Sequence, residues 1–179
     1  MLLAFVTDKP FRPFALEELR PSPECRVYYA RKYSKNDWLN RTMAGLRDGE
    51  RAIWSVEPYG PQPTKLRFTG PVAVLIGSGT FSSANILANA IQDYGLAEII
   101  GRDTAEIPNN FGMPCPVVLP HTQITLDVPS TYFVRANGDE ADHSDVHPNI
   151  VVLPGERDVD VAVDWIEKTI ASPSMTPRH

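Results

Sequence analysis

The segment GSGTFSSANILANAI (residues 77–91) places four hydroxyl side chains where an apolar run gives way to a helix-like pattern. A serine at the start of a helix usually caps it, because the hydroxyl accepts a hydrogen bond from a free backbone N–H. The same position suits catalysis, because free N–H groups at the positive helix end stabilise an oxyanion beside an attacking serine. Ser82 therefore has two interpretations, a helix cap and a nucleophile, and local geometry alone does not separate them.

The segments around Ser82 predict a strand, a helix and a second strand. PVAVLIG (71–77) is typical of a strand buried on both faces in the centre of a parallel sheet, and AEIIG (97–101) is a shorter strand. Residues 82–94 between them predict a helix that ends at Gly95. Its apolar stripe comprises Ile86, Leu87, Ala90, Ile91 and Tyr94. Its other faces carry the polar residues Asn85, Asn89, Gln92 and Asp93. Such a unit builds parallel sheets by a right-handed crossover, so the predicted fold class is α/β.

Other segments predict elements that would surround this unit. Residues 26–46 predict one helix that partly covers a sheet, although the apolar period is imperfect. Three later runs resemble strands, namely CPVVLP, QITLDV and STYFVR. Residues 150–153 are again apolar, and residues 158–169 predict a closing amphipathic helix.

Length and composition bound the class of protein. With 179 residues, 42% of them hydrophobic, the chain is predicted to form a single domain over residues 1–179. The net charge is -5 and basic residues form no stripe, so we expect no nucleic-acid partner. The apolar runs are shorter than the roughly 20 residues that cross a bilayer, so no membrane span is predicted. Cys25 and Cys115 are too few for a disulfide framework, and whether they pair is left open.

The stretch GPVAVLIGSGTFSSANILANAIQDYGLAEIIGRDT resembles the nucleophile region of the C-terminal processing peptidases, also called tail-specific proteases. The positions that match are Gly79, Thr80, Phe81, Ser82, Ile86, Leu87, Ala88, Asp93 and Gly101. The Thr-Phe-Ser-Ser-Ala version at residues 80–84 is similar to a bacterial branch of this family. Later motifs agree, and the resemblance covers about residues 66–153.

The resemblance implies a fold, an activity and site residues. The fold would be a ClpP/crotonase-like α/β spiral core, and the activity would be that of a serine-type peptidase acting on peptides or proteins, with no cofactor. Ser82 would be the nucleophile, and the backbone N–H of Ser83 would donate one hydrogen bond to the oxyanion.

The chain departs from the family pattern at the general base. Many members place a lysine about twenty-five positions after the serine, and that position is Ile107 here. Tricorn-like relatives instead use an upstream histidine with a later acidic residue, for which Asp142 is the candidate. Every histidine of this chain follows Ser82. We therefore expect the chain to be the later part of a larger, exported peptidase, without the upstream oxyanion turn or any PDZ-like domain, and inactive alone.

Two other functions use the same kind of fold. Retinoid-carrying proteins of the eye hold apolar ligands on it, so a non-catalytic module that binds an apolar ligand or a peptide is the alternative. An acyl-thioester enzyme of the crotonase type is disfavoured, because paired glycine-rich oxyanion turns are missing from the sequence. Self-association is a further expectation, through a patch formed by Tyr28, Tyr29 and Tyr33.

Three further patterns have ordinary structural explanations. GDEADHSDVH (138–147) gathers carboxylates and imidazoles, but a run of this kind is usually a solvated loop, so no metal site is predicted. GSG (77–79) lacks the later residues of a phosphate-binding loop and is better explained as a tight turn. Trp38, Trp54 and Trp165 are expected to be core or cover residues rather than a ligand box.

Overall fold

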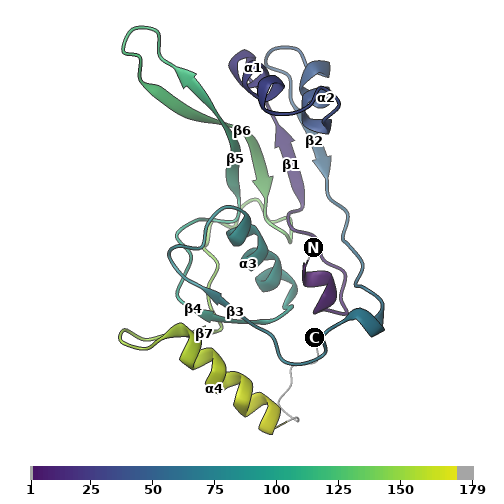
Figure 1. Cartoon of the computed structure of the whole chain (residues 1–179), viewed down its shortest axis with the longest axis vertical. Helices are drawn as coiled ribbons and strands as arrows, with labels where there is room; N and C mark the ends of the chain where they lie inside the picture. The colour runs from purple at the N-terminus through teal and green to yellow at the C-terminus, as the bar shows by residue number, and fades with distance from the viewer. Residues whose placement is uncertain (1, 173–179) are drawn as a thin grey trace.

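Two β-sheets organise the chain in the computed structural model, which describes residues 2–172 (Figure 1). An antiparallel sheet has the strand order β2-β1-β6-β5, and a parallel sheet has the order β3-β4-β7. The strands are β1 (Leu16–Leu19), β2 (Ala52–Ser55), β3 (Ala73–Ile76), β4 (Glu98–Gly101), β5 (Asn110–Val118), β6 (Thr125–Val134) and β7 (Ile150–Val151). The helices are η1 (Leu2–Phe5), α1 (Pro23–Lys32), α2 (Trp38–Gly45), η2 (Thr64–Leu66), α3 (Ser83–Tyr94) and α4 (Asp158–Ala171).

The predicted strand, helix and strand unit is confirmed as β3, α3 and β4, with β3 and β4 parallel. Strand β4 is covered on both faces: Ile99 joins the cluster that includes Ile91 of α3, and Ile100 joins the cluster that includes Ala162 of α4. Gly95 ends α3 in the left-handed conformation with φ 59°. None of the described helices combines the length and apolar character needed to cross a membrane. The parallel sheet is therefore a layer between α3 and α4 (Figure 1).

The prediction that residues 71–77 form a central strand is wrong in one respect. Among the described strands, β3 lies at the edge of the parallel sheet and β4 lies in the middle. The side chain of Leu75 is accordingly exposed, with 42% of its surface accessible. An unbroken apolar run does not distinguish a central strand from an edge strand whose outer side is uncovered.

Residues 26–46, predicted to form one helix, belong to two. Helix α1 begins after Ser22, whose hydroxyl accepts a hydrogen bond from Cys25 N–H at 3.2 Å. Helix α2 begins after Asp37, whose carboxylate accepts one from Leu39 N–H at 2.9 Å. The polar turn between Tyr33 and Asp37 interrupts the helix because Asp37 caps a new one. Both helices pack on the antiparallel sheet, so the prediction that residues 26–46 partly cover a sheet is confirmed.

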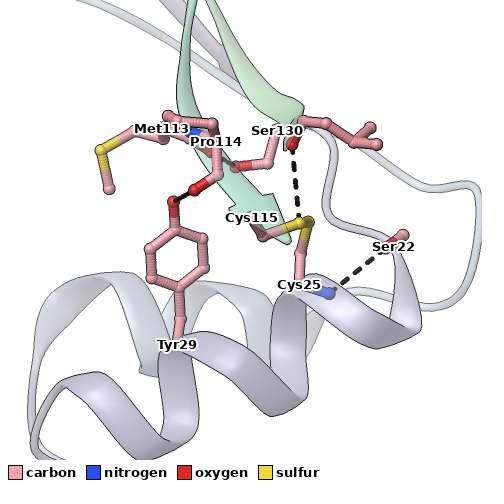
Figure 2. Close-up of a disulfide and its surroundings, with 8 residues drawn as sticks. Ser22, Cys25, Tyr29, Met113, Pro114, Cys115 and Ser130 are labelled. Atoms are coloured by element: carbon pink, nitrogen blue, oxygen red, sulfur yellow. Dashed lines mark hydrogen bonds between the residues drawn. A yellow bond between two sulfur atoms is a disulfide. The ribbon is translucent and has the colours of Figure 1, made fainter. Parts of the chain in front are cut away.

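A disulfide between Cys25 and Cys115 joins α1 to β5 (Figure 2). The two cysteines are 90 residues apart in sequence, and their Cα atoms are 5.3 Å apart. Beside the disulfide, the hydroxyl of Tyr29 donates a hydrogen bond to the carbonyl of Pro114 at 3.0 Å. The pairing that the sequence left open is thus settled, and it fixes α1 on the sheet.

The three strand-like runs after residue 114 form two strands. CPVVLP contributes to β5, while QITLDV and STYFVR are continuous in β6. Pro129 lies between these two runs, opposite Pro114 of β5, and the antiparallel pairing continues on both sides. Strands β5 and β6 form a long hairpin that projects from the body of the chain (Figure 1).

Candidate active site

Ser82 lies in a tight connection between β3 and α3. The N–H of Thr80 donates to the carbonyl of Gly77 at 2.8 Å, and the N–H of Gly77 donates to the hydroxyl of Thr80 at 3.1 Å. These bonds confirm the tight turn predicted for GSG. Ser82 then adopts φ 54° and ψ -129° before the helix begins at Ser83. A non-glycine residue in such a conformation costs about 1–3 kcal/mol, and such residues concentrate at functional sites.

The hydroxyl of Ser82 does not cap α3. Ser82 occupies the N-cap position, but its side chain makes no capping hydrogen bond, and the residue is exposed. Ser22 shows the ordinary alternative, because with φ -78° its hydroxyl caps α1. The two serines that precede helices α1 and α3 therefore differ in backbone conformation and in whether the hydroxyl caps the helix.

The backbone N–H of Ser83, the predicted oxyanion donor, lies at the start of α3. It belongs to the first turn of α3, where N–H groups have no partner within the helix. The N–H of Ala84 is already bonded to the carbonyl of Phe81 at 3.2 Å. Within residues 2–172, no group accepts a hydrogen bond from Ser83 N–H. A negative charge beside Ser82 would therefore meet an unoccupied donor at the positive end of a helix.

Glu106 is a site residue that the sequence reasoning missed. Its carboxylate accepts a hydrogen bond from the backbone N–H of Ser82. Its own carbonyl accepts hydrogen bonds from Asn85 Nδ2 at 2.7 Å and from the Thr104 hydroxyl at 3.2 Å. Glu106 is thus fixed at its backbone and holds the strained residue. The available signal was its place beside Ile107, the position at which the resemblance implies a lysine base.

Two asparagines of α3 that lie outside the predicted apolar stripe are in the interior of the protein. Asn85 and Asn89 are buried, with 0% and 1% of their surface exposed. Asn89 Oδ1 accepts a hydrogen bond from the N–H of Ala136 at 2.9 Å. Asp93 pairs with Arg135 at 2.8 Å, and these two side chains are 4% and 3% exposed. The helix is held by distant polar partners as well as by its apolar stripe, and apolar periodicity alone does not identify those partners.

Asp142, the candidate acidic residue, is engaged in a polar network. Its carboxylate pairs with the guanidinium of Arg135, which also binds Asp93. The other carboxylate oxygen accepts hydrogen bonds from the N–H and the hydroxyl of Ser144, at 2.9 and 2.6 Å. The described structure shows no hydrogen bond between Asp142 and Ser82. The network connects the end of α3 to the loop that carries Asp142.

No described histidine contacts Ser82 by a hydrogen bond. His147 pairs with Asp103 at 3.0 Å, and both side chains are exposed. His121 and His143 are also exposed, and His179 lies outside the described residues. Over residues 2–172, no group of histidine, cysteine and acidic side chains could hold a metal ion. The general base is therefore unassigned within this part of the chain.

Gly101 fixes the sheet beneath the site. It pairs with Ile76, the last residue of β3, and has φ +138°. A Cβ atom at Gly101 would lie 2.0 Å from the carbonyl oxygen of Ile76. Only glycine allows β4 to approach β3 at the point where the chain turns toward Ser82.

A comparison of the sequence with models of protein families gives a match that agrees with this fold and with an exposed serine after a parallel strand. The model for Peptidase family S41 matches residues 17–152, so the chain belongs to this family. No curated protein matches the chain.

Solved structures share the fold. A crystal structure of a CPAF mutant is 18% identical, with a TM-score of 0.55, over 94% of this chain and 38% of that one. Mature CPAF is 17% identical, with a TM-score of 0.54, over 94% of this chain and 39% of that one. A candidate peptidase from Parabacteroides merdae is 14% identical, with a TM-score of 0.51, over 98% of this chain and 46% of that one. The α/β core is confirmed, and the chain spans less than half the length of these structures.

Proposed function

We propose that this chain is the later part of a serine-type peptidase of the tail-specific protease kind, with Ser82 as its nucleophile. The single observation that carries the proposal is the exposed hydroxyl of Ser82, held at positive φ and not used as a helix cap. Membership in Peptidase family S41 supports peptides or proteins as the substrate class. The matching Thr-Phe-Ser-Ser-Ala motif at residues 80–84 supports the assignment to the bacterial branch.

The chemistry assigns a separate role to each group. Ser82 Oγ attacks the carbonyl carbon of the scissile bond and loses its proton to a general base. The carbonyl oxygen becomes negatively charged and accepts a hydrogen bond from Ser83 N–H. The protonated base then donates its proton to the leaving amine, and water hydrolyses the acyl-enzyme. Glu106 binds the Ser82 backbone and does not take part in proton transfer in this scheme.

The base and a second oxyanion donor are proposed to come from a part of the parent protein that precedes residue 1. Asp142 is the proposed acidic partner of that base, and Arg135 holds its carboxylate in place. The isolated chain is then expected to have little or no activity, because loss of triad members reduces rates by several orders of magnitude.

Export of the parent protein is supported by the disulfide. A bond between Cys25 and Cys115 persists in oxidising compartments and is rare in the reducing cytosol. We therefore propose that the protein acts outside the cytoplasm, in agreement with the expectation from the family resemblance.

A second candidate is a non-catalytic binding module on the same fold. Phe81, beside Ser82, has 68% of its surface exposed, and no described residue supplies a base to the hydroxyl. An apolar surface next to an inactive serine would suit an apolar ligand or an apolar peptide.

Hydrolysis of an unstructured protein substrate would separate the two candidates. The test compares this chain with a form extended upstream, each with and without Ser82→Ala. Ser78→Ala is the matched control, because Ser78 is an exposed serine of the preceding turn. The peptidase proposal predicts that cleavage occurs in the extended form, survives Ser78→Ala and is abolished by Ser82→Ala. An extended form that cleaves nothing, or cleaves equally well with Ser82→Ala, would favour the binding module.

A further inference from the structure

A pocket formed by residues far from Ser82 in the sequence is lined by two indole rings and a carboxylate. It has a volume of about 380 Å³ and is lined by Glu17, Trp38, Thr42 and Trp54. Glu17 lies on β1, Trp54 lies opposite it on β2, and the other two residues belong to α2. The pocket therefore forms where α2 covers the edge of the antiparallel sheet.

Glu17 occupies a position that usually holds an apolar residue. Along β1 the burial alternates, and Glu17 shares the buried face with Leu19, a core residue. Only 8% of Glu17 is exposed. Its neighbour Glu18 is on the opposite face and pairs with Arg51 at 3.0 Å. Of these two glutamates, Glu17 on the core side therefore has no cationic partner among the described residues.

An unpaired carboxylate in a buried position is unfavourable. Among the described residues, no lysine, arginine or histidine forms an ion pair with Glu17. Burial raises the pKa of Glu17, and a hydrogen bond with Trp54 lowers it in part. Buried charges in proteins are normally paired, so the position favours a cation supplied from outside the chain.

The two tryptophans have the geometry that attracts such a cation. Their rings are 5.5 Å apart between centroids and nearly perpendicular, at 87°. Trp38 has 48% of its surface exposed, while Trp54 is half-buried against the core. In this edge-to-face contact, the ring that points its edge at its partner keeps both of its own faces free of that partner. A ring face carries negative potential, and cations bind within about 6 Å of a ring centroid.

We propose that Glu17, Trp38 and Trp54 form a binding site for an organic ammonium group. The indole rings contact the methylene or methyl groups of the ligand and its positive charge. The Glu17 carboxylate neutralises that charge. The ammonium group could belong to a lysine side chain of a peptide or to a free quaternary amine, because both offer a cation with an apolar surround. This role goes beyond the core or cover positions that the sequence predicts for Trp38 and Trp54.

Titration of the oxidised chain, followed by the indole N–H signals in ¹H–¹⁵N NMR spectra, tests this site. The probes are tetramethylammonium and N-acetyl-lysine methylamide, which distinguish the two sources of the ammonium group. A neutral tert-butyl alcohol is the shape control. The site predicts saturable shifts of the Trp38 and Trp54 signals with one or both cations, no shift of Trp165, and no comparable response to the alcohol.

Matched variants separate binding from structure. Glu17→Gln preserves an acceptor for Trp54 and is expected to weaken cation binding about tenfold, whereas Glu18→Gln removes the same charge from the opposite face and should leave binding within about twofold. Trp38→Leu should also weaken binding about tenfold. Circular dichroism confirms that each variant is folded. Absence of saturable shifts with both cations, equal binding of the alcohol, or equal effects of Glu17→Gln and Glu18→Gln would overturn the proposal.

Discussion

The backbone N–H of Ser82 donates a hydrogen bond to the carboxylate of Glu106, which lies 24 residues later in the sequence. Glu106 is held in turn by Asn85 of α3, whose side chain donates to its carbonyl at 2.7 Å. The helix that begins beside Ser82 therefore also positions the residue that fixes Ser82. This closed set of contacts offsets part of the cost of the positive φ at Ser82.

Removal of the Glu106 carboxylate is expected to slow the reaction of Ser82. Glu106→Ala should reduce the rate of labelling by a fluorophosphonate about tenfold in the extended protein, because Ser82 can then relax from its strained conformation. Glu106→Gln retains an acceptor for the Ser82 N–H and should recover most of the rate. Equal loss in both variants would mean that the charge of Glu106, rather than its hydrogen bond, matters.

A side chain at position 101 is expected to disrupt the sheet under the site. Gly101→Ala places a Cβ atom 2.0 Å from the carbonyl oxygen of Ile76, so the strands must separate. Urea denaturation should show a loss of more than about 2 kcal/mol in the free energy of unfolding. Gly77→Ala is the control, because a Cβ atom there meets nothing within 4 Å, and it should cost less than about 1 kcal/mol. Similar losses in the two variants would contradict the packing described for Gly101.

Arg135 is expected to be a major contributor to stability. Its ion pair with Asp93 is almost fully buried, and Arg135→Met would leave Asp93 charged and without its partner. We expect a loss of about 3–5 kcal/mol in the free energy of unfolding. The exposed pair of Arg157 and Asp160 is the control, and Arg157→Met should change stability by less than about 1 kcal/mol. An Arg135→Met protein as stable as the control would show that water or rearrangement compensates Asp93.

The stability contribution of Glu17 is expected to depend on pH. Its pKa is raised above the ordinary value of 4.5, chiefly by burial. A carboxyl group with a raised folded-state pKa stabilises the fold when protonated, and this contribution is lost as the pH rises through that pKa. Glu17→Gln should therefore raise the free energy of unfolding at about pH 7 and change it less at about pH 4. Urea denaturation at the two pH values measures this difference, and a destabilised variant at neutral pH would contradict it.

The sequence predicted the elements around Ser82 because their signals are local. The apolar run of β3, the stripe of α3 and the glycine at its end are all read within about thirty residues. The tight turn before Ser82 was also predicted and is confirmed. The resemblance indicated a peptidase, and the match over residues 17–152 establishes membership in Peptidase family S41, while the assignment to the tail-specific protease branch stays a prediction.

Features that depend on distant contacts could not be predicted in this way. Asn85 and Asn89 are buried because their partners, the carbonyl of Glu106 and the N–H of Ala136, reach α3 from later segments. The disulfide required α1 to bring Cys25 next to β5, and no spacing rule links residues 90 positions apart. The roles of Ser82, Ser83 and Asp142, the single-domain organisation and self-association stay predictions.

The central claim is that the Ser82 oxygen is the nucleophile, and the site of a covalent adduct tests it most directly. The extended protein is treated with a fluorophosphonate, digested and mapped by mass spectrometry. The account predicts one phosphonyl group on Ser82, lost in Ser82→Ala and retained in Ser78→Ala. An adduct on another serine, with Ser82 unmodified in a protein that cleaves its substrate, would contradict it.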